Sequence, residues 1–282
     1  MLLLNFNKGF VLKRIVKLLP DTSRIIEKFI QTRVKEAGTD GVVLGLSGGI
    51  DSATTLALAV SSLGGDNVLG LIMPFRDSES ITLASNHAQS LGVKTKKYNI
   101  SSIVKSFKGV TNSYSSKASE GNLHSRVRMS LLYGEAFSLN SLVIGTSNKS
   151  ELLVGYYTKW GDGASDFLPI GDIYKSQVYA LAESLEVPKE ILDRVPTAEL
   201  WEGQSDEEEL GIDYLTLDKI LLGLERQLSF DKLSSNTGIT VESITRIDNL
   251  IKFTIHKRVF PPVCKIGRRT VGLDWRETIG SK

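Results

Sequence analysis

Apolar residues recur along the chain with two different spacings, and each spacing predicts a different kind of element. Over residues 21–37 they fall at helical intervals on one face, which predicts an amphipathic helix. Short apolar runs have the length of buried strands instead, and they lie at 41–45, 68–73, 93–100 and 141–144. Helical segments separate these runs, and we expect them over 53–60, 80–91 and 126–137. Strands that alternate with helices predict an α/β fold with a doubly wound parallel sheet flanked by helices.

The second half of the chain shows no further strand pattern and predicts a helical C-terminal section. Helices are expected over 173–185, 216–227 and 241–253. Residues 156–172 hold glycines and acids around Lys159 without periodicity, which is typical of a binding loop. The acidic stretch 201–209 predicts a mobile loop, and Pro261 with Pro262 prevents further helix.

These patterns predict one domain over residues 1–282. We expect an N-terminal extension at 1–20, a parallel-sheet core at about 21–200, and a helical section with a tail at about 201–282. A chain of 282 residues is long enough to bury a sizeable core in such a domain.

Composition and charge exclude several classes of function. The chain is 41% hydrophobic and 23% charged, as in ordinary globular proteins. Its formal net charge is only +2, without a long basic run, so we expect no nucleic-acid partner. Asn5 and Lys8 break the apolar start, and no apolar run approaches the ~20 residues of a membrane span, so we expect no signal peptide and no membrane partner. The single cysteine, Cys264, permits no intrachain disulfide and favours a cytoplasmic location.

A glycine-rich turn joins the first predicted strand to the helix after it. Its residues are Gly45, Leu46, Ser47, Gly48, Gly49, Ile50, Asp51 and Ser52. Glycines let main-chain N–H groups approach a phosphate, the serine hydroxyls add donors, and the start of a helix favours an anion. The turn lacks the lysine of a Walker loop, and an acid stands in its place. Because a carboxylate repels phosphate, Asp51 either shares a divalent cation with it or caps the helix.

A second strand, turn and helix pattern spans residues 143–151. Thr146 stands at the strand end, where its hydroxyl can bond to a base or a ribose. Glu151 follows Asn148 by three residues, so it either completes a capping box or gives the cation a second carboxylate. Several other polar residues have simple surface or helix-end explanations when taken singly, namely Lys159, Asp166, Lys175, Thr197 and His256.

Together these motifs carry a resemblance to a known family. Residues 47–52, Ser-Gly-Gly-Ile-Asp-Ser, resemble the signature of the ATP pyrophosphatase (PP-loop) superfamily, whose members release pyrophosphate from ATP and adenylate a substrate oxygen. Further motifs look like ammonia-dependent NAD synthetase: 145–151 (Gly-Thr-Ser-Asn-Lys-Ser-Glu), 158–166 (Thr-Lys-x-Gly-Asp-Gly-x-x-Asp), Lys175, 196–200 (Pro-Thr-Ala-Glu-Leu) and 256–258 (His-Lys-Arg). The resemblance runs from about Ile25 to the C-terminus and implies an adenine nucleotide alpha hydrolase-like fold.

The resemblance implies roles for individual residues. ATP contacts are implied for residues 45–52, Thr146, Lys175 and Thr197, and Mg²⁺ ligands at Asp51 and Glu151. Contacts to deamido-NAD are implied for Arg126, Lys159, Asp166, His256 and Lys257. The catalytic residues are then Asp51, Lys159 and Lys175.

The family pattern also bears on assembly and on the choice between two arginines. Arg126 and Arg128 lie two apart on one predicted helix, so they point to different faces. The pattern selects Arg126 for the substrate, and we expect Arg128 in a structural ion pair. Members of the family are homodimers with the substrate site near the interface, and we expect the same here.

The reaction implied by the resemblance has two steps. The nicotinate carboxylate of deamido-NAD attacks the α-phosphorus of ATP, which gives an adenylate and pyrophosphate. Ammonia then attacks the activated carbonyl, which gives NAD and AMP. Cys264 stands in no recognisable amidase motif, so we expect ammonia from solution or from another protein.

Two other classes of function remain open at this point. The first is another PP-loop adenylating ligase, such as a GMP synthetase-type catalytic unit or a tRNA-modifying ligase. A tRNA enzyme should show a basic, aromatic-rich surface or extra cysteines, and this chain shows neither. The second is a regulatory protein that binds ATP but releases no pyrophosphate.

Overall fold

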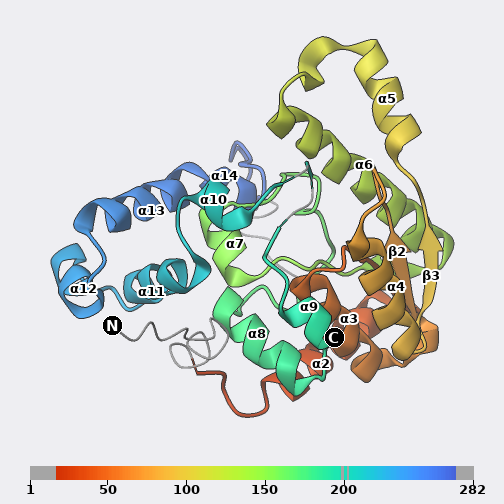
Figure 1. The fold of residues 1–282 in the computed structure, drawn as a ribbon, viewed down its shortest axis with the longest axis horizontal. Coiled ribbons are helices and arrows are strands. Elements are labelled where there is room, and N and C mark those ends of the chain that lie inside the picture. Colours follow the sequence, from red (N-terminus) through yellow and green to blue (C-terminus); the bar gives the residue numbers. More distant parts are fainter. Residues whose placement is uncertain (1–16, 198–199, 202, 271–282) are drawn as a thin grey trace, which may run out of the picture.

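A four-stranded parallel sheet forms the centre of the structure, a computed structural model that describes residues 17–197, 200–201 and 203–270 (Figure 1). The strands are β1 (Gly41–Gly45), β2 (Val68–Ile72), β3 (Lys94–Lys97) and β4 (Ser141–Val143), in the order β3-β2-β1-β4. Val43 of β1 aligns with Leu69 of β2 and with Val143 of β4, and both pairs are parallel. The chain crosses from β3 back to β4, so the winding reverses between β1 and β4. The predicted doubly wound parallel sheet is confirmed.

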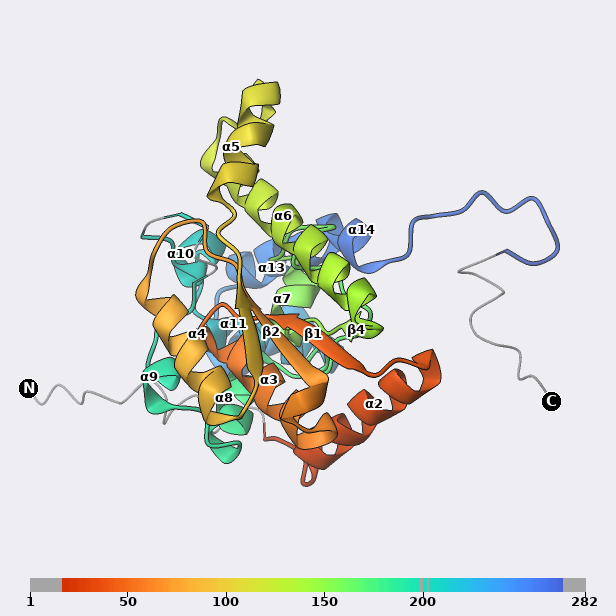
Figure 2. The same ribbon diagram turned by 90° about the vertical axis from the view of Figure 1, so that its right-hand side faces the viewer.

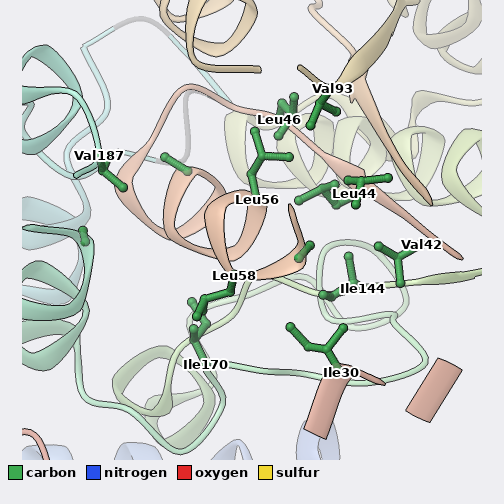
Figure 3. Packing of buried hydrophobic residues seen from close by; sticks show 14 of the residues in the cluster. Ile30, Val42, Leu44, Leu46, Leu56, Leu58, Val93, Ile144, Ile170 and Val187 are labelled. Carbon is green, nitrogen blue, oxygen red and sulfur yellow. The ribbon is translucent and has the colours of Figure 1, made fainter. Parts of the chain in front are cut away.

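Alternate residues of β1 point into two cores, one on each face of the sheet. Val42 and Leu44 point into the larger core (Figure 3). Helices α2 (Thr22–Ala37), α3 (Ile50–Leu63), α4 (Glu79–Ser90), α8 (Lys175–Ser184) and α9 (Lys189–Leu192) contribute to this core. Helix α2 buries Ile26, Ile30 and Val34, four residues apart, which is the apolar stripe that its sequence predicts.

The opposite face of the sheet is covered by α5 (Ser101–Val110) and α6 (Lys117–Ser138). Val43 points to this side and packs in the second core with Leu123 and Val127 of α6. Figure 2 shows α6 crossing the strands on the side away from α2 and α3. In both views α5 and the first part of α6 project beyond the sheet (Figures 1 and 2).

The C-terminal section is helical, as predicted, and has a third core. Its helices are α10 (Asp206–Leu210), α11 (Tyr214–Glu225), α12 (Phe230–Thr237), α13 (Val241–Phe253) and α14 (Ile255–Arg258), and α7 (Lys149–Val154) packs against α11 and α13. Leu217 and Ile220 of α11 and Ile244 of α13 are fully buried in it. Val154 of α7 and Tyr174, which precedes α8, belong to the same cluster. The helices that follow β4 are therefore packed directly against the C-terminal section.

The structure differs from the predicted elements mainly at their ends. Helix α6 begins at Lys117 rather than at 126, because a capping box of Ser116 and Ser119 starts it ahead of a polar first half. Strand β3 covers only part of 93–100, and all of its residues are exposed at the edge of the sheet. Residues 206–210 form α10 where composition predicts a loop, because Asp206 is buried and accepts a hydrogen bond from Tyr156. Helices α5 and α12 have no counterpart among the predicted elements.

Two further predictions concern the chain ends and membrane spans. Most of the predicted N-terminal extension and the end of the tail lie outside the described residues. Among the helices of the described ranges, none is both long enough and apolar enough to cross a bilayer.

Candidate active site

The glycine-rich turn leaves β1 beside the point where the winding reverses and leads into α3. Gly48 has a φ of +78°, and a Cβ at this position would lie 2.4 Å from the carbonyl oxygen of Ser80. Only glycine satisfies both conditions without strain. Nη1 of Arg194 donates a hydrogen bond to the Gly48 carbonyl at 3.3 Å. Among the residues that the structure describes, no side chain caps the start of α3, so Asp51 is not its cap. The first N–H groups of this helix are therefore available to bind an anion.

Two serine hydroxyls hold the turn in shape from within. Oγ of Ser47 accepts a hydrogen bond from the Gly49 N–H at 3.2 Å, and Oγ of Ser52 donates to the Gly49 carbonyl at 2.9 Å. The two hydroxyl oxygens are 3.1 Å apart. The turn is therefore fixed before any phosphate arrives, which lowers the cost of ordering it around a ligand.

Asp51, Glu151 and Lys175 come from three separate segments and meet beside this turn. Nζ of Lys175 bonds to Oδ2 of Asp51 and lies 3.4 Å from Oε1 of Glu151. Nδ2 of Asn148 donates to the other oxygen of Asp51 at 2.9 Å. The Lys175 side chain is only 3% exposed, so its ammonium is buried between the two carboxylates.

Glu151 has a second role at the start of α7. Its N–H donates to Oδ1 of Asn148 at 3.0 Å, and its Oε2 accepts from the Asn148 N–H at 3.2 Å. This is the capping box that the sequence predicts as one alternative. The cap uses only Oε2, and Oε1 faces Lys175, so the role of Glu151 as a metal ligand is compatible with the cap and stays a prediction.

Burial sets the ionisation of this cluster. Burial raises the pKa of Glu151 to about 8, and the charge of Asp51 adds to the rise. Burial acts to lower the pKa of Lys175, but Asp51 and Glu151 outweigh it and hold this pKa above its ordinary value. Without ligands, these surroundings favour the charged form of Lys175 and the protonated form of Glu151.

The donor set fits a magnesium ion that is shared with nucleotide phosphates. Carboxylate oxygens are hard ligands, and phosphate-bound magnesium commonly takes one or two of them from the protein. Asp51 and Glu151 supply such oxygens from two sides of one point, which the Lys175 ammonium occupies here. Within the described ranges, no three His, Cys, Asp or Glu side chains gather in a way that suits a metal. An ion at this point therefore depends on phosphate oxygens and on displacement of Lys175.

A cavity of about 840 Å³ lies over the turn and the charged cluster. Its lining includes nearly all of the predicted nucleotide and metal residues: Gly45, Leu46, Ser47, Gly49, Ile50, Asp51, Ser52, Thr146, Glu151, Lys175 and Thr197. Gly48 is not among the lining residues, because it packs against the backbone of Ser80.

The lining also includes residues that the sequence pattern does not single out. Met73 and Phe75 directly follow β2. Ligands bind at the carboxyl ends of parallel strands, so their position in the sequence was enough to predict that they line the site. Arg194 and Asp206 reach the cavity from the segment after α8, where no local pattern marks them.

The residues predicted to contact the substrate lie outside this lining. They are Arg126, Lys159, Asp166, His256 and Lys257. Nη2 of Arg126 donates to the Lys159 carbonyl at 3.3 Å, and Nζ of Lys159 donates to the His256 carbonyl at 2.8 Å. Three of the five therefore form a connected chain of contacts from α6 through the 156–172 loop to α14.

Asp166 and Lys257 make contacts that hold the backbone. Oδ2 of Asp166 accepts from the Val143 N–H of β4 at 2.7 Å. Nζ of Lys257 donates to the carbonyls of Gly155 at 2.6 Å and Tyr157 at 2.8 Å. These contacts stabilise the sheet edge and the binding loop, and the substrate roles of both residues stay predictions.

The two arginines of α6 face different surroundings, as predicted from their spacing. Arg128 lines the cavity, and its Nε donates to the Met73 carbonyl at the end of β2 at 3.0 Å. Arg126 does not belong to the cavity lining and contacts the Lys159 carbonyl instead. Arg128 was predicted to form a structural ion pair. Because it also lines the cavity, it is well placed to contact a ligand there.

Comparison with known proteins finds close relatives over most of the chain. Residues 22–261 match the family model described as NAD synthase. The NH(3)-dependent NAD(+) synthetase of Thermococcus kodakarensis is 46% identical over 237 residues, which are 84% of this chain and 93% of that protein. An NH3-dependent NAD synthetase from Campylobacter jejuni, solved with nitrate, matches with a TM-score of 0.74 and 35% identity over 87% of this chain and 98% of that one. An NMN synthetase from Francisella tularensis matches with a TM-score of 0.79 and 32% identity, over 89% and 100% of the two chains.

Proposed function

This chain belongs to the NAD synthase family, and from that premise we propose how its residues carry out the ammonia-dependent synthesis of NAD from deamido-NAD. The reaction consumes ATP and ammonia and yields NAD, AMP and pyrophosphate. The observation that supports the assignment of roles is the meeting of Asp51, Glu151 and Lys175 at a preorganised glycine-rich turn inside one cavity.

The first step is adenylation of the substrate carboxylate. ATP phosphates bind the N–H groups of the turn and the uncapped start of α3, with Thr146 and Thr197 on the wall of the same cavity. The nicotinate carboxylate attacks the α-phosphorus, the bond to the β-phosphate oxygen breaks, and pyrophosphate leaves. Lys175 stays protonated and can turn from Asp51 to the phosphates, where it offsets the negative charge that develops on the leaving group.

Asp51 and Glu151 would hold the magnesium ion that accompanies the nucleotide. When bound, this ion supplies positive charge to the triphosphate and orients it. A cation near Glu151 favours the ionised carboxylate, so we expect Glu151 to release its proton as the metal and nucleotide bind. The capping contact through Oε2 fixes the orientation of this side chain meanwhile.

The second step is attack of ammonia on the activated carbonyl. The new C–N bond forms, the bond between the carbonyl carbon and the phosphate oxygen breaks, and AMP leaves with that oxygen. The nitrogen then gives one proton to water, which leaves the amide. Neutral ammonia needs no side-chain base for the attack itself, so the contribution of the protein is to position the adenylate and to exclude competing water.

We propose that the dinucleotide lies partly outside the ATP cavity, along the chain formed by Arg126, Lys159 and His256. We also propose a homodimer. Its support is the exposed apolar surface at the end of α6, where Phe137 is 91% and Leu139 44% exposed. Sedimentation analysis tests this assembly, and a monomer at micromolar concentration would contradict it.

Product analysis tests the proposed function. Purified protein with ATP, magnesium, ammonium and deamido-NAD should form equal amounts of AMP, pyrophosphate and NAD. ADP as the nucleotide product would refute the mechanism. Because one similar structure is an NMN synthetase, nicotinate mononucleotide belongs in the assay as a competing substrate, and we expect a higher kcat/KM for deamido-NAD.

Variants of two lysines locate the chemistry in the charged cluster. Lys175→Met should abolish pyrophosphate release, because it removes the buried ammonium beside Asp51. Lys252→Met is the matched control, because Lys252 is exposed and pairs along its own helix with Asp248. Equal activity in both variants would contradict the role of Lys175.

A further inference from the structure

Asp218 belongs to α11 in the C-terminal section, yet its carboxylate reaches the start of two helices that carry site residues. The residue is fully buried. Its Oδ1 accepts a hydrogen bond from Oγ of Ser150 at 2.5 Å, and its Oδ2 accepts from the Ser176 N–H at 2.8 Å. Oγ of Ser150 in turn accepts from the N–H of Lys175 at 2.9 Å. No motif in the sequence singles out Asp218.

These contacts join the backbone of α7 to that of α8. Ser150 directly precedes Glu151 in the first turn of α7, and Lys175 and Ser176 are the first residues of α8. The first N–H groups of a helix lack partners within the helix. Here Ser150 and Asp218 supply acceptors to two of them in α8, and the Asp218 carboxyl group lies at the positive end of that helix. One carboxylate thus fastens both helix starts to α11.

A carboxyl group at this depth in the core calls for an explanation, because its burial is unfavourable. Burial raises the pKa of Asp218, while the hydrogen bonds from Ser150 and Ser176 lower it. Well-packed apolar residues often stabilise a core as much as a buried charged network does, so stability alone does not call for a carboxylate here. Its two oxygens instead accept hydrogen bonds from Ser150 and Ser176. These residues belong to the two segments that place the Glu151 and Lys175 side chains beside Asp51.

We propose that Asp218 is a positioning residue for the adenylation step, acting through Ser150 and the start of α8 to hold Lys175 and Glu151 at Asp51. The inference rests on the proposed roles of Lys175 and Glu151. It makes the C-terminal section part of the catalytic apparatus, although Asp218 touches no ligand.

The test is Asp218→Asn, which keeps the size of the side chain but replaces one acceptor oxygen with a donor. The amide cannot accept from both Ser150 and Ser176. We expect kcat to fall roughly 10- to 100-fold, the usual effect of losing a residue that orients such ligands. The KM for ATP and equilibrium ATP binding without metal should be unchanged, because the 45–52 turn keeps its own hydrogen bonds. Amide exchange should rise at residues 175 and 176.

Asp213→Asn is the matched control, because it removes a carboxylate from the same helix. Asp213 is exposed at the start of α11, where its Oδ1 caps the helix by accepting a hydrogen bond from the Thr216 N–H at 3.0 Å. This variant should keep the wild-type kcat. Turnover is normalised to ATP-binding sites, so a smaller folded fraction does not imitate a lower kcat.

The outcomes separate positioning from stability. A lower melting temperature with unchanged kcat per ATP-binding site would show a structural role only and would overturn the proposal. If Asp218→Asn does not fold, Ser150→Ala removes the contacts of the Ser150 hydroxyl with Asp218 and with the Lys175 N–H, while Asp218 keeps its contact with the Ser176 N–H. A wild-type kcat in this variant overturns the proposal equally. Activity retained in Lys175→Met would instead refute the proposed role of Lys175, on which the inference rests, whereas an inactive Lys175→Met with a normal Asp218→Asn refutes only the positioning role of Asp218.

Discussion

Replacing Glu151 with glutamine should stabilise the ligand-free protein above neutral pH while it abolishes turnover. The reason is the raised pKa of the buried Glu151 carboxyl, about 8 against an ordinary 4.5. Between these two values the folded protein binds more protons at this position than the unfolded chain does. Stability therefore falls as pH rises through the window from about 4.5 to 8. A glutamine side chain does not titrate, so the variant loses this pH dependence.

The size of the effect follows from the shift. A rise from 4.5 to about 8 is about 3.5 pKa units, which at ~1.4 kcal/mol per unit gives an upper limit of about 5 kcal/mol above pH 8. At pH 7 the same relation gives about 3 kcal/mol. Glutamine also loses attraction to Lys175, whose Nζ lies 3.4 Å from Glu151. We therefore expect a net gain of about 1–3 kcal/mol at pH 8.5 after this loss.

Urea unfolding in EDTA from pH 5 to pH 9 measures this prediction. Wild type and Glu151→Gln should differ most at the alkaline end and converge near pH 5. In a thermal scan, each kcal/mol corresponds to roughly 2–4 °C for a protein of this size class. Glu242→Gln is the control, because Glu242 also lies in the first turn of a helix but is exposed, and its substitution should change stability little at any pH.

Magnesium and ATP should reverse the order of stability. The wild type gains stability from ligand binding, whereas Glu151→Gln lacks one proposed metal ligand and gains less. The reasoning is refuted if the ligand-free variant is less stable than wild type at pH 8.5, or if the difference between them is independent of pH. Pyrophosphate release at the wild-type rate in the variant would separately refute the metal role of Glu151.

The site supports three further predictions. Gly48→Ala should weaken ATP binding at least ~10-fold in calorimetry, since strain at a φ of +78° costs on the order of 1–3 kcal/mol. Gly109→Ala should bind ATP normally, because Gly109 lies outside the cavity lining and its Cβ would have no neighbour within 4 Å. Arg128→Ala should raise the KM for ATP and Arg126→Ala the KM for deamido-NAD only; steady-state kinetics showing the reverse pattern would contradict the arrangement around α6. Tyr156→Phe removes the hydroxyl that hydrogen-bonds to Asp206 and Glu209, so it should lower the free energy of unfolding, measured in urea, by about 1–3 kcal/mol. An unchanged free energy of unfolding would contradict a stabilising role for this hydroxyl.

Features encoded by neighbouring residues were predictable from the sequence. The apolar runs of β1 and β2 and the stripe of α2 are local signals, because a buried strand or helix face needs them wherever it packs. The glycine-rich turn is equally local, since Gly48 needs its conformation for reasons found within and beside the turn. The parallel sheet followed from the alternation of these elements.

Features that depend on distant segments were not predictable in the same way. Spacing on a helix shows that Arg126 and Arg128 face apart, but only the packing of α6 on the sheet decides which of them lines the cavity. Asp218 lies in α11, far along the chain from Ser150 and Lys175, and no local pattern connects them. The capping box of Glu151 was visible in sequence, whereas its second contact needed the approach of α8.

Both edges of the central sheet are poor templates for another strand. Strand β3 presents Lys94, Lys96 and Lys97 at one edge, and charged lysines there oppose the approach of a second molecule. At the other edge, Phe167 pairs with Ile144 just beyond β4, and the Asp166 carboxylate accepts a hydrogen bond from the Val143 N–H. Fibril-like stacking between copies is therefore disfavoured at either edge. We therefore expect the proposed dimer to form through helical surfaces rather than through one continuous sheet.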